Sequence, residues 1–243
     1  MTFGPAIPPR ETVEDFPALG VEAFTTTRAA GDYGLGDGDP PPAALEKWRA
    51  LQSSLSGAAP RLASARQVHG TRILVHGDTW EGWLCADGAD GHIALTGGVA
   101  LAVTIADCVP VFIAHPSGAV ALLHAGWRGV AGRILPKAIA RLAEAGLDAA
   151  SLRVHLGPAI CGRCYEVGPD VFEQLTGWTT VRNRNVDLRA LLAEQAKQHG
   201  AWQLTASPHC TRCDNDRFFS HRAGDAGRQL SVIVAPAAGA VHP

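Results

Sequence analysis

The chain of 243 residues has no excess of charge of either sign: 21 Lys and Arg stand against 23 Asp and Glu, a formal net charge of −2. A nucleic-acid or membrane-surface protein needs a basic excess, so this balance argues against both classes. The sequence also contains no GxGxxG motif, no Walker loop and no basic–aromatic stripe. With 18% charged and 47% hydrophobic residues, the chain is too apolar to be disordered and can bury a large core.

Long hydrophobic runs are missing as well. The longest uncharged stretch, residues 108–127, is interrupted by Pro110, Pro116, Gly118 and Gly126, so it predicts two buried strands and a turn rather than a membrane-spanning helix. The first residues, MTFGPAIPPRETVEDF, lack the basic and apolar regions of a secretory signal. We therefore expect a cytoplasmic protein whose six cysteines are reduced thiols or metal ligands rather than disulfides.

Strand and helix patterns are mixed along the chain. Apolar, β-branched runs predict strands at 21–27, 64–76 with a break at Gly70, 99–106, 109–114, 119–124, 152–156, 202–206 and 229–235. Helical patterns cover 45–55, 129–145 with a kink or true start at Pro136, 169–175, and 187–199 with a cap at Asp187 and an end at Gly200. The sequence predicts an α+β (mixed α/β) fold, a single domain over residues 1–243 with mixed, largely antiparallel sheets covered by helices.

A cysteine and a histidine flank the predicted hairpin of residues 109–124. If its strands pair antiparallel about the HPSG turn, partners have numbers that sum to 232 or 233, and Cys108 meets His124 at the end away from the turn. Both residues are followed by loop-like sequence, where scaffolds commonly present catalytic groups. The pair fits the nucleophile and base of a cysteine hydrolase. A buried thiol beside a hydrogen-bonded core histidine is the alternative.

Two CxxC pairs follow, Cys161-Gly-Arg-Cys164 and Cys210-Thr-Arg-Cys213. Their internal spacing is typical of a four-cysteine structural zinc site, although the 45 residues between them exceed the usual gap. On this pattern alone, the chain is either a zinc-stapled binding module or carries four unligated thiols.

Several short segments together carry a family resemblance. They are QVHG at 67–70, ADC at 106–108, HAGWRG at 124–129, GPAI at 157–160, YEVG at 165–168 and FFSHR at 218–222. On these motifs the chain resembles the YfiH-like family, also called laccase-domain-containing or multicopper polyphenol oxidase proteins and described as purine nucleoside phosphorylases. The resemblance runs from TTR at 26–28 almost to the C-terminus.

One segment departs from the family pattern. The family usually follows TTR with Gly-Gly-Val-Ser and Ser-Leu-Asn-Leu-Gly, whereas this chain has AAGDYGLGDGD. Substrate contacts from that loop are therefore not carried over. Because residues 31–42 are rich in Gly, Asp and Pro, we expect them to form a loop that rims the pocket and moves when no ligand is bound.

The resemblance implies that His69, Cys108 and His124 bind one zinc ion and form the catalytic centre. Two imidazoles and a thiolate suit zinc, and three protein ligands leave a position open for water or substrate. Arg28 and Arg128 are candidates for holding phosphate, with a structural ion pair as the alternative for each. Asp107 and Gln67 are candidates for orienting a metal-bound histidine, with turn capping as the alternative.

The activity implied by the resemblance is phosphorolysis of adenosine, inosine or S-methyl-5'-thioadenosine, together with deamination of adenosine. The substrates are then a purine nucleoside and phosphate. Three alternatives stay open: a copper-dependent polyphenol oxidase, as the older family name suggests, a Cys108–His124 hydrolase, and a zinc-stapled binding module. Against copper-cluster chemistry, the ten histidines contain no His-x-His pair, and the only methionine is Met1.

Overall fold

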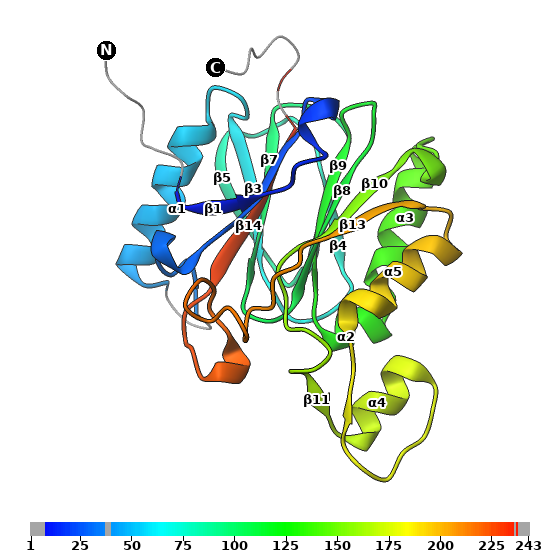
Figure 1. The fold of residues 1–243 in the computed structure, drawn as a ribbon. Coiled ribbons are helices and arrows are strands. Elements are labelled where there is room, and N and C mark those ends of the chain that lie inside the picture. Colours follow the sequence, from blue (N-terminus) through cyan, green and yellow to red (C-terminus); the bar gives the residue numbers. More distant parts are fainter. Residues whose placement is uncertain (1–7, 37–39, 236, 238–243) are drawn as a thin grey trace.

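Two six-stranded sheets lie face to face in the computed structural model, which describes residues 8–36, 40–235 and 237 (Figure 1). Helices cover the outer face of each sheet, so the chain forms four layers. The mixed α/β class expected from the sequence is confirmed.

The first sheet is mixed. Its strands follow the order β1 (Arg10–Thr12), β2 (Glu22–Thr26), β14 (Gln229–Ala235), β7 (Val99–Ile105), β3 (Arg61–Arg66) and β5 (Gly82–Asp87). β3 runs parallel to both β5 and β7, and the other neighbours are antiparallel.

The second sheet is also mixed. Its order is β13 (Gln203–Ala206), β10 (Arg153–Leu156), β8 (Val109–Ala114), β9 (Val120–Ala125), β6 (Gly91–Ala94) and β4 (Ile73–His76). The pairs β10–β13 and β4–β6 are parallel. A separate two-stranded ribbon joins β11 (Glu166–Val167) to β12 (Arg184–Asn185).

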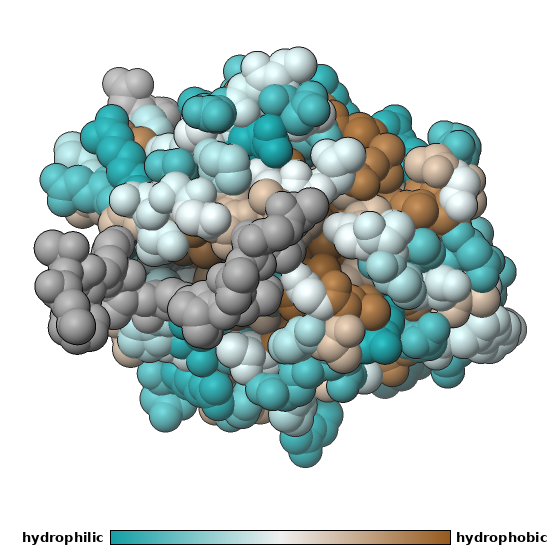
Figure 2. All heavy atoms as spheres, turned by 90° about the horizontal axis from the view of Figure 1, so that it is seen from above, coloured by the Kyte–Doolittle hydropathy of each residue, from teal (hydrophilic) through white to brown (hydrophobic). Residues whose placement is uncertain are grey.

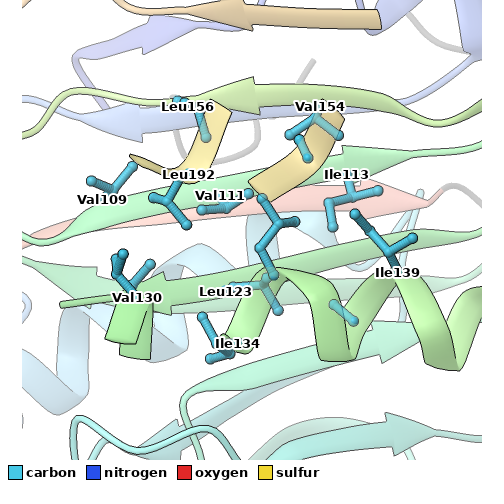
Figure 3. Packing of buried hydrophobic residues seen from close by; sticks show 14 of the residues in the cluster. Val109, Val111, Ile113, Leu123, Val130, Ile134, Ile139, Val154, Leu156 and Leu192 are labelled. Carbon is cyan, nitrogen blue, oxygen red and sulfur yellow. The ribbon is translucent and has the colours of Figure 1, made fainter. Parts of the chain in front are cut away.

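The helices are α1 (Pro42–Leu55), α2 (Trp127–Ala131), α3 (Ile134–Glu144), α4 (Pro169–Thr176) and α5 (Leu188–Gln198). α1 packs Trp48, Leu51 and Leu55 against the first sheet. α2, α3 and α5 cover the second sheet, where Val111 and Leu123 meet helix residues such as Ile139 and Leu192 (Figure 3). α4 lies beside the two-stranded ribbon at the lower end of Figure 1.

The central strands are buried on both faces. Leu101, Val103 and Ile105 of β7 face the second sheet, while Ala100 and Ala102 face α1. Side chains alternate between the faces of a strand, so a strand covered on both faces needs an apolar residue at nearly every position. This explains why the sequence of β7 shows a continuous apolar run.

The predicted helix over 129–145 is in fact two helices. The break falls between α2 and α3, where Arg133 adopts a left-handed conformation (φ 62°). Pro136 lies in the first turn of α3, where its missing N–H costs no helical hydrogen bond. The side chain of Asp187 caps α5 by accepting from the N–H groups of Arg189 and Ala190.

The β8–β9 hairpin differs from the expected register. Pro110 pairs with His124 and Ala114 with Val120, so partner numbers sum to 234 instead of 232 or 233. The reason is a longer turn: residues 115–119 connect the strands, and the N–H of His115 donates to the carbonyl of Ala119 at 2.9 Å. Continuing this register places Cys108 opposite residue 126 rather than opposite His124.

Within the described ranges, no helix combines the length and apolar character needed to cross a membrane. Hydrophilic residues cover most of the face seen in Figure 2, with hydrophobic residues showing between them. That face belongs to the end of the sheets opposite α4. The functional candidates lie at the α4 end.

Candidate metal centre

Three crossovers from the first sheet to the second meet at one end of the molecule. They join β3 to β4, β5 to β6, and β7 to β8. The first carries His69 and the third carries Cys108, while His124 comes from β9 beside the start of β8. The crossovers between the two sheets thus bring histidine and cysteine side chains from distant parts of the sequence to one end of the molecule.

The structure brings together the three side chains that the sequence selected as metal ligands. One ligand atom each from His69, Cys108 and His124 lies within 4.8 Å of the other two. The two imidazole rings are 4.8 Å apart between centroids and nearly perpendicular, at 78°. His124 is buried, Cys108 is half-buried and His69 is exposed. Two imidazoles and a thiolate in this arrangement can hold zinc or copper with a coordination position left open.

A buried carboxylate that the sequence did not single out orients two of these ligands. Asp90, in the crossover between β5 and β6, is fully buried. It accepts hydrogen bonds from the backbone N–H groups of His69 at 2.9 Å, Gly70 at 2.7 Å and Val68 at 3.3 Å. The Nδ1–H of His124 donates to the same carboxylate at 2.8 Å. Because Nδ1 of His124 is engaged, its Nε2 is left to bind a metal.

Both ligand-bearing crossovers contain a strained residue. His69 (φ 56°) and Asp107 (φ 85°) adopt the left-handed conformation that side chains with a Cβ rarely take. The hydrogen bonds to Asp90 hold the turn at His69. The carboxylate of Asp107 accepts from the Thr211 hydroxyl at 2.6 Å and from the Arg222 N–H at 2.7 Å, and so holds the turn before Cys108.

Asp107 and Gln67 therefore have partners other than the expected histidine. The hydrogen bonds of the Asp107 carboxylate reach Thr211 and Arg222, and the role proposed for it falls to Asp90. The Gln67 amide bonds the backbone of Thr104 on β7, donating at 2.8 Å and accepting at 2.7 Å. Gln67 and Asp107 each hold a crossover against a neighbouring segment, and neither orients a histidine ring.

The charges at the centre alternate in sign. Burial opposes the ionisation of the Cys108 thiol, but the charge on His124 and hydrogen bonds from both histidines outweigh it and lower its pKa to about 6. Burial alone would lower the pKa of His124, and the Cys108 thiolate and Asp90 instead raise it to about 9. Burial opposes the ionisation of Asp90 too, yet its bonds to His124 and the backbone lower its pKa. Without a metal, the site is a carboxylate–imidazolium–thiolate chain.

A glycine leaves room for this cluster. A Cβ added to Gly126 would lie 2.9 Å from the Cys108 sulfur and 3.2 Å from Cδ2 of His69. Both distances are shorter than ordinary van der Waals contact, so a side chain here would push the ligands apart. Gly126, the first glycine of HAGWRG, thus leaves the space that the metal ligands occupy.

The three ligands open onto a cavity of about 640 Å³. Residues 32, 34–36 and 41 contribute to its wall, so part of the 31–42 loop rims the pocket as expected, while residues 37–39 lie outside the described ranges. Four arginines also line it: Arg66, Arg128, Arg222 and Arg228. Aromatic walls come from Trp48, Trp127 and Tyr165. The cavity combines a metal-ligating corner, cations and flat apolar surfaces.

The two arginines selected as phosphate candidates have different surroundings. Arg28 is outside the cavity wall; its guanidinium bonds the carbonyls of Asn215 and Phe218 and pairs with Asp225 at 2.7 Å. It therefore has the structural ion pair that was its alternative. Arg128 is exposed on the cavity wall with its guanidinium 4.4 Å above the Trp127 ring, and no carboxylate in the described part of the chain neutralises it.

Comparison with known proteins identifies relatives over most of the chain. The family model for multi-copper polyphenol oxidoreductase laccase matches residues 22–236. A purine nucleoside phosphorylase of Deinococcus radiodurans is 36% identical over an alignment of 243 residues that covers 90% of this chain and 91% of the relative. An adenosine deaminase, RL5, of an unknown prokaryotic organism is 32% identical over 232 residues, covering 84% of this chain and 88% of the relative.

A solved structure shares the fold. The crystal structure of the Bacillus licheniformis hypothetical protein YfiH superposes with a TM-score of 0.84 at 24% identity, covering 94% of this chain and 97% of that one. This likeness concerns the fold alone. Together with the family match, it confirms the YfiH-like resemblance read from the motifs.

Replacing Asp90 with Asn is expected to weaken metal binding at the His69–Cys108–His124 centre by about 10- to 100-fold, because the neutral amide holds the His124 ring and the His69 turn less firmly. The dissociation constant is measured by competition with a chromophoric chelator. Asp148→Asn, which changes an exposed carboxylate, is the matched control. Equal affinities for the two variants would contradict the orienting role of Asp90.

Gly126→Ala is expected to lower metal occupancy of the same centre while the protein remains folded, because the new methyl group collides with the Cys108 sulfur. Metal content after dialysis and the circular dichroism spectrum are the measurements. Gly57→Ala is a suitable control, since a Cβ there meets nothing within 4 Å. Full occupancy in Gly126→Ala would show that the ligands are not crowded at this position.

Proposed function

The chain belongs to the YfiH-like family of multi-copper polyphenol oxidoreductase laccase proteins, and on this premise we propose that it is a metal-dependent purine nucleoside phosphorylase. The substrates are adenosine, inosine or S-methyl-5'-thioadenosine and inorganic phosphate, and adenosine deamination is a second activity of the same site. The similarity to a purine nucleoside phosphorylase and to an adenosine deaminase supports this proposal.

The single observation that carries the proposal is the joint placement of a metal-ligating cluster, unpaired positive charge and aromatic surface in one cavity. The cavity volume of about 640 Å³ falls within the range of small-molecule sites. A purine ring suits a flat wall such as Trp127 or Tyr165. Phosphate suits the fork of an arginine such as Arg128.

The donor set fits zinc. His69, Cys108 and His124 would hold the ion, since borderline-soft zinc takes imidazole nitrogen and thiolate sulfur together, and the buried Asp90 keeps Nε2 of His124 free for it. When bound, the ion supplies a Lewis acid next to the substrate. The same donors also accept copper, and metal analysis of the purified protein distinguishes the two ions.

The residues of the chain account for binding and proton handling in the proposed reaction. Arg128 holds the phosphate, whose oxygen attacks the anomeric carbon of the ribose. The bond from that carbon to the purine nitrogen breaks, the nitrogen gains the proton that the hydrogen phosphate loses, and the products are ribose 1-phosphate and the free base. Burial raises the pKa of Tyr165, so its phenol stays protonated at neutral pH and is a hydrogen-bond donor for the departing base.

A cysteine hydrolase is the second candidate, because one observation favours it. In the metal-free site the Cys108 thiolate lies against the His124 imidazolium, as in nucleophile–base pairs. The two candidates differ in what Cys108 does: it is a metal ligand in the first and attacks the substrate in the second.

The decisive experiment incubates the zinc-loaded protein with adenosine, with and without phosphate, and separates the purine products. Phosphorolysis yields adenine only when phosphate is present, whereas deamination yields inosine in either condition. A second assay tests the oxidase alternative. Copper-loaded protein is incubated with a phenol, and oxidation of the phenol is measured. Absence of adenine, hypoxanthine and inosine with zinc-loaded protein would overturn the proposed function.

Replacement of any one ligand separates metal catalysis from thiol catalysis. His69→Ala, Cys108→Ala and His124→Ala are each expected to lose the metal of this centre and to lower kcat/KM by more than about 100-fold. Cys85→Ala, which removes an exposed thiol outside the centre, should change neither. If Cys108→Ala abolishes turnover while it binds as many metal ions per chain as the wild type, Cys108 is a nucleophile instead.

Alkylation gives an independent readout. Bound metal occupies the sulfur of Cys108, so we expect this residue to resist iodoacetamide in the loaded protein and to react once a chelator removes the metal. Peptide mass spectrometry identifies the labelled residue. Stoichiometric labelling of Cys108 with the metal still bound would exclude its role as a ligand.

Arg128→Ala is expected to raise the KM for phosphate by about tenfold or more, because a charge-assisted contact is lost, while deamination of adenosine, which uses no phosphate, is much less affected. Steady-state kinetics at varied phosphate provide the measurement. Arg182→Ala, on an exposed segment outside the cavity wall, is the control. An unchanged KM in Arg128→Ala would remove this residue from the phosphate site.

A further inference from the structure

The two CxxC motifs meet although they are far apart in the sequence. Cys161 and Cys164 lie in one turn and Cys210 and Cys213 in another, and the four sulfur atoms are all within 4.8 Å of one another. The sulfurs of Cys164 and Cys213 are 3.4 Å apart. None of the four belongs to the wall of the cavity.

The separations match a single tetrahedral ion. Zinc–sulfur bonds are about 2.3 Å, and a regular tetrahedron of such bonds has sulfur–sulfur edges of about 3.8 Å. A disulfide would bring two sulfurs to about 2.05 Å, much closer than the 3.4 Å seen here. An iron–sulfur cluster spreads its cysteines around several metal atoms and needs wider spacing. We propose that Cys161, Cys164, Cys210 and Cys213 bind a second zinc ion with a structural role.

The backbone around the sulfurs supports thiolate ligands. The N–H groups of Cys161 and Cys213 point at the sulfur of Cys210, with nitrogen–sulfur distances of 3.2 and 3.5 Å. Hydrogen bonds of this kind stabilise the negative charge on a metal-bound sulfur. Each motif also places an arginine, Arg163 or Arg212, directly before its second cysteine. The guanidinium of Arg212 donates to the carbonyl of Cys164 at 3.3 Å, which keeps a positive charge beside a zinc–tetrathiolate unit whose net charge is −2.

Four cysteine ligands complete the coordination of zinc, so this ion has no position open for substrate. Its effect is to join two turns that 45 residues of the sequence separate. Asp107 accepts a hydrogen bond from a residue next to the first turn and another from a residue within the second. The N–H of Ile160 donates to the Asp107 carbonyl at 3.1 Å, and the Thr211 hydroxyl donates to its carboxylate at 2.6 Å. The second zinc therefore stabilises the segments that hold the strained turn before Cys108.

The inference does not depend on the proposed function, because it concerns different ligands. To isolate the second site, the experiment uses Cys108→Ala, which lacks the thiolate of the first centre. We expect this variant to retain one zinc per chain, and X-ray absorption at the zinc edge to show four sulfur neighbours at about 2.3 Å. Adding Cys164→Ser and Cys213→Ser should reduce zinc to below about 0.1 per chain. Adding Cys85→Ser instead should leave it unchanged.

The outcomes are distinct. Zinc with four sulfur neighbours that is lost with Cys164 and Cys213 supports the site. Absence of zinc from Cys108→Ala, nitrogen or oxygen neighbours, iron in place of zinc, or disulfide-linked cysteines in the denatured, alkylated protein would each overturn it. If the variants lacking Cys164 and Cys213 fail to fold, the absorption spectrum of Cys108→Ala alone decides, since it needs no change in the four cysteines.

Discussion

The buried carboxylate of Asp90 is the constraint on which the metal centre depends. It binds the backbone of the His69 turn and the imidazole of His124 at once. A fully buried carboxylate is stable only when its oxygens are satisfied by hydrogen bonds or charge. The hydrogen bonds of Asp90 hold the crossover between β3 and β4 against the end of β9. They therefore bring the imidazoles of His69 and His124 together before any metal binds.

The sheet topology explains why this end of the molecule carries the chemistry. Three successive crossovers pass from one sheet to the other there, and each must turn sharply within a few residues. Left-handed backbone at His69 and Asp107 makes two of these turns, and a carboxylate stabilises each one: Asp90 the first, and that of Asp107 itself the second. The strain stays local because buried strands on both sides fix the crossover ends.

Features with a local signature could be predicted from the sequence, and features that depend on long-range contacts could not. The buried strands β7 and β8, the Asp187 cap and the three ligand motifs all have signatures within a few residues. β5 and β6 do not: β5 is half exposed without strict alternation, and β6 contains Gly91 and His92. Missing these strands hid Asp90 between them. Asp107 was chosen because it adjoins Cys108 in sequence, but its carboxylate points to residues more than a hundred positions away.

The same long-range contacts show that the centre cannot be assembled by its ligand segments alone. Residues 67–126 supply His69, Cys108, His124 and Asp90, yet the turn before Cys108 is fixed by Thr211 and Arg222 from the last part of the chain. Thr211 and Arg222 are themselves held in place. Thr211 lies within the second CxxC motif, and the guanidinium of Arg222 donates to the carbonyl of Glu166. The last part of the chain thus stabilises the strained turn in the first part, and these long-range contacts turn three scattered motifs into one site.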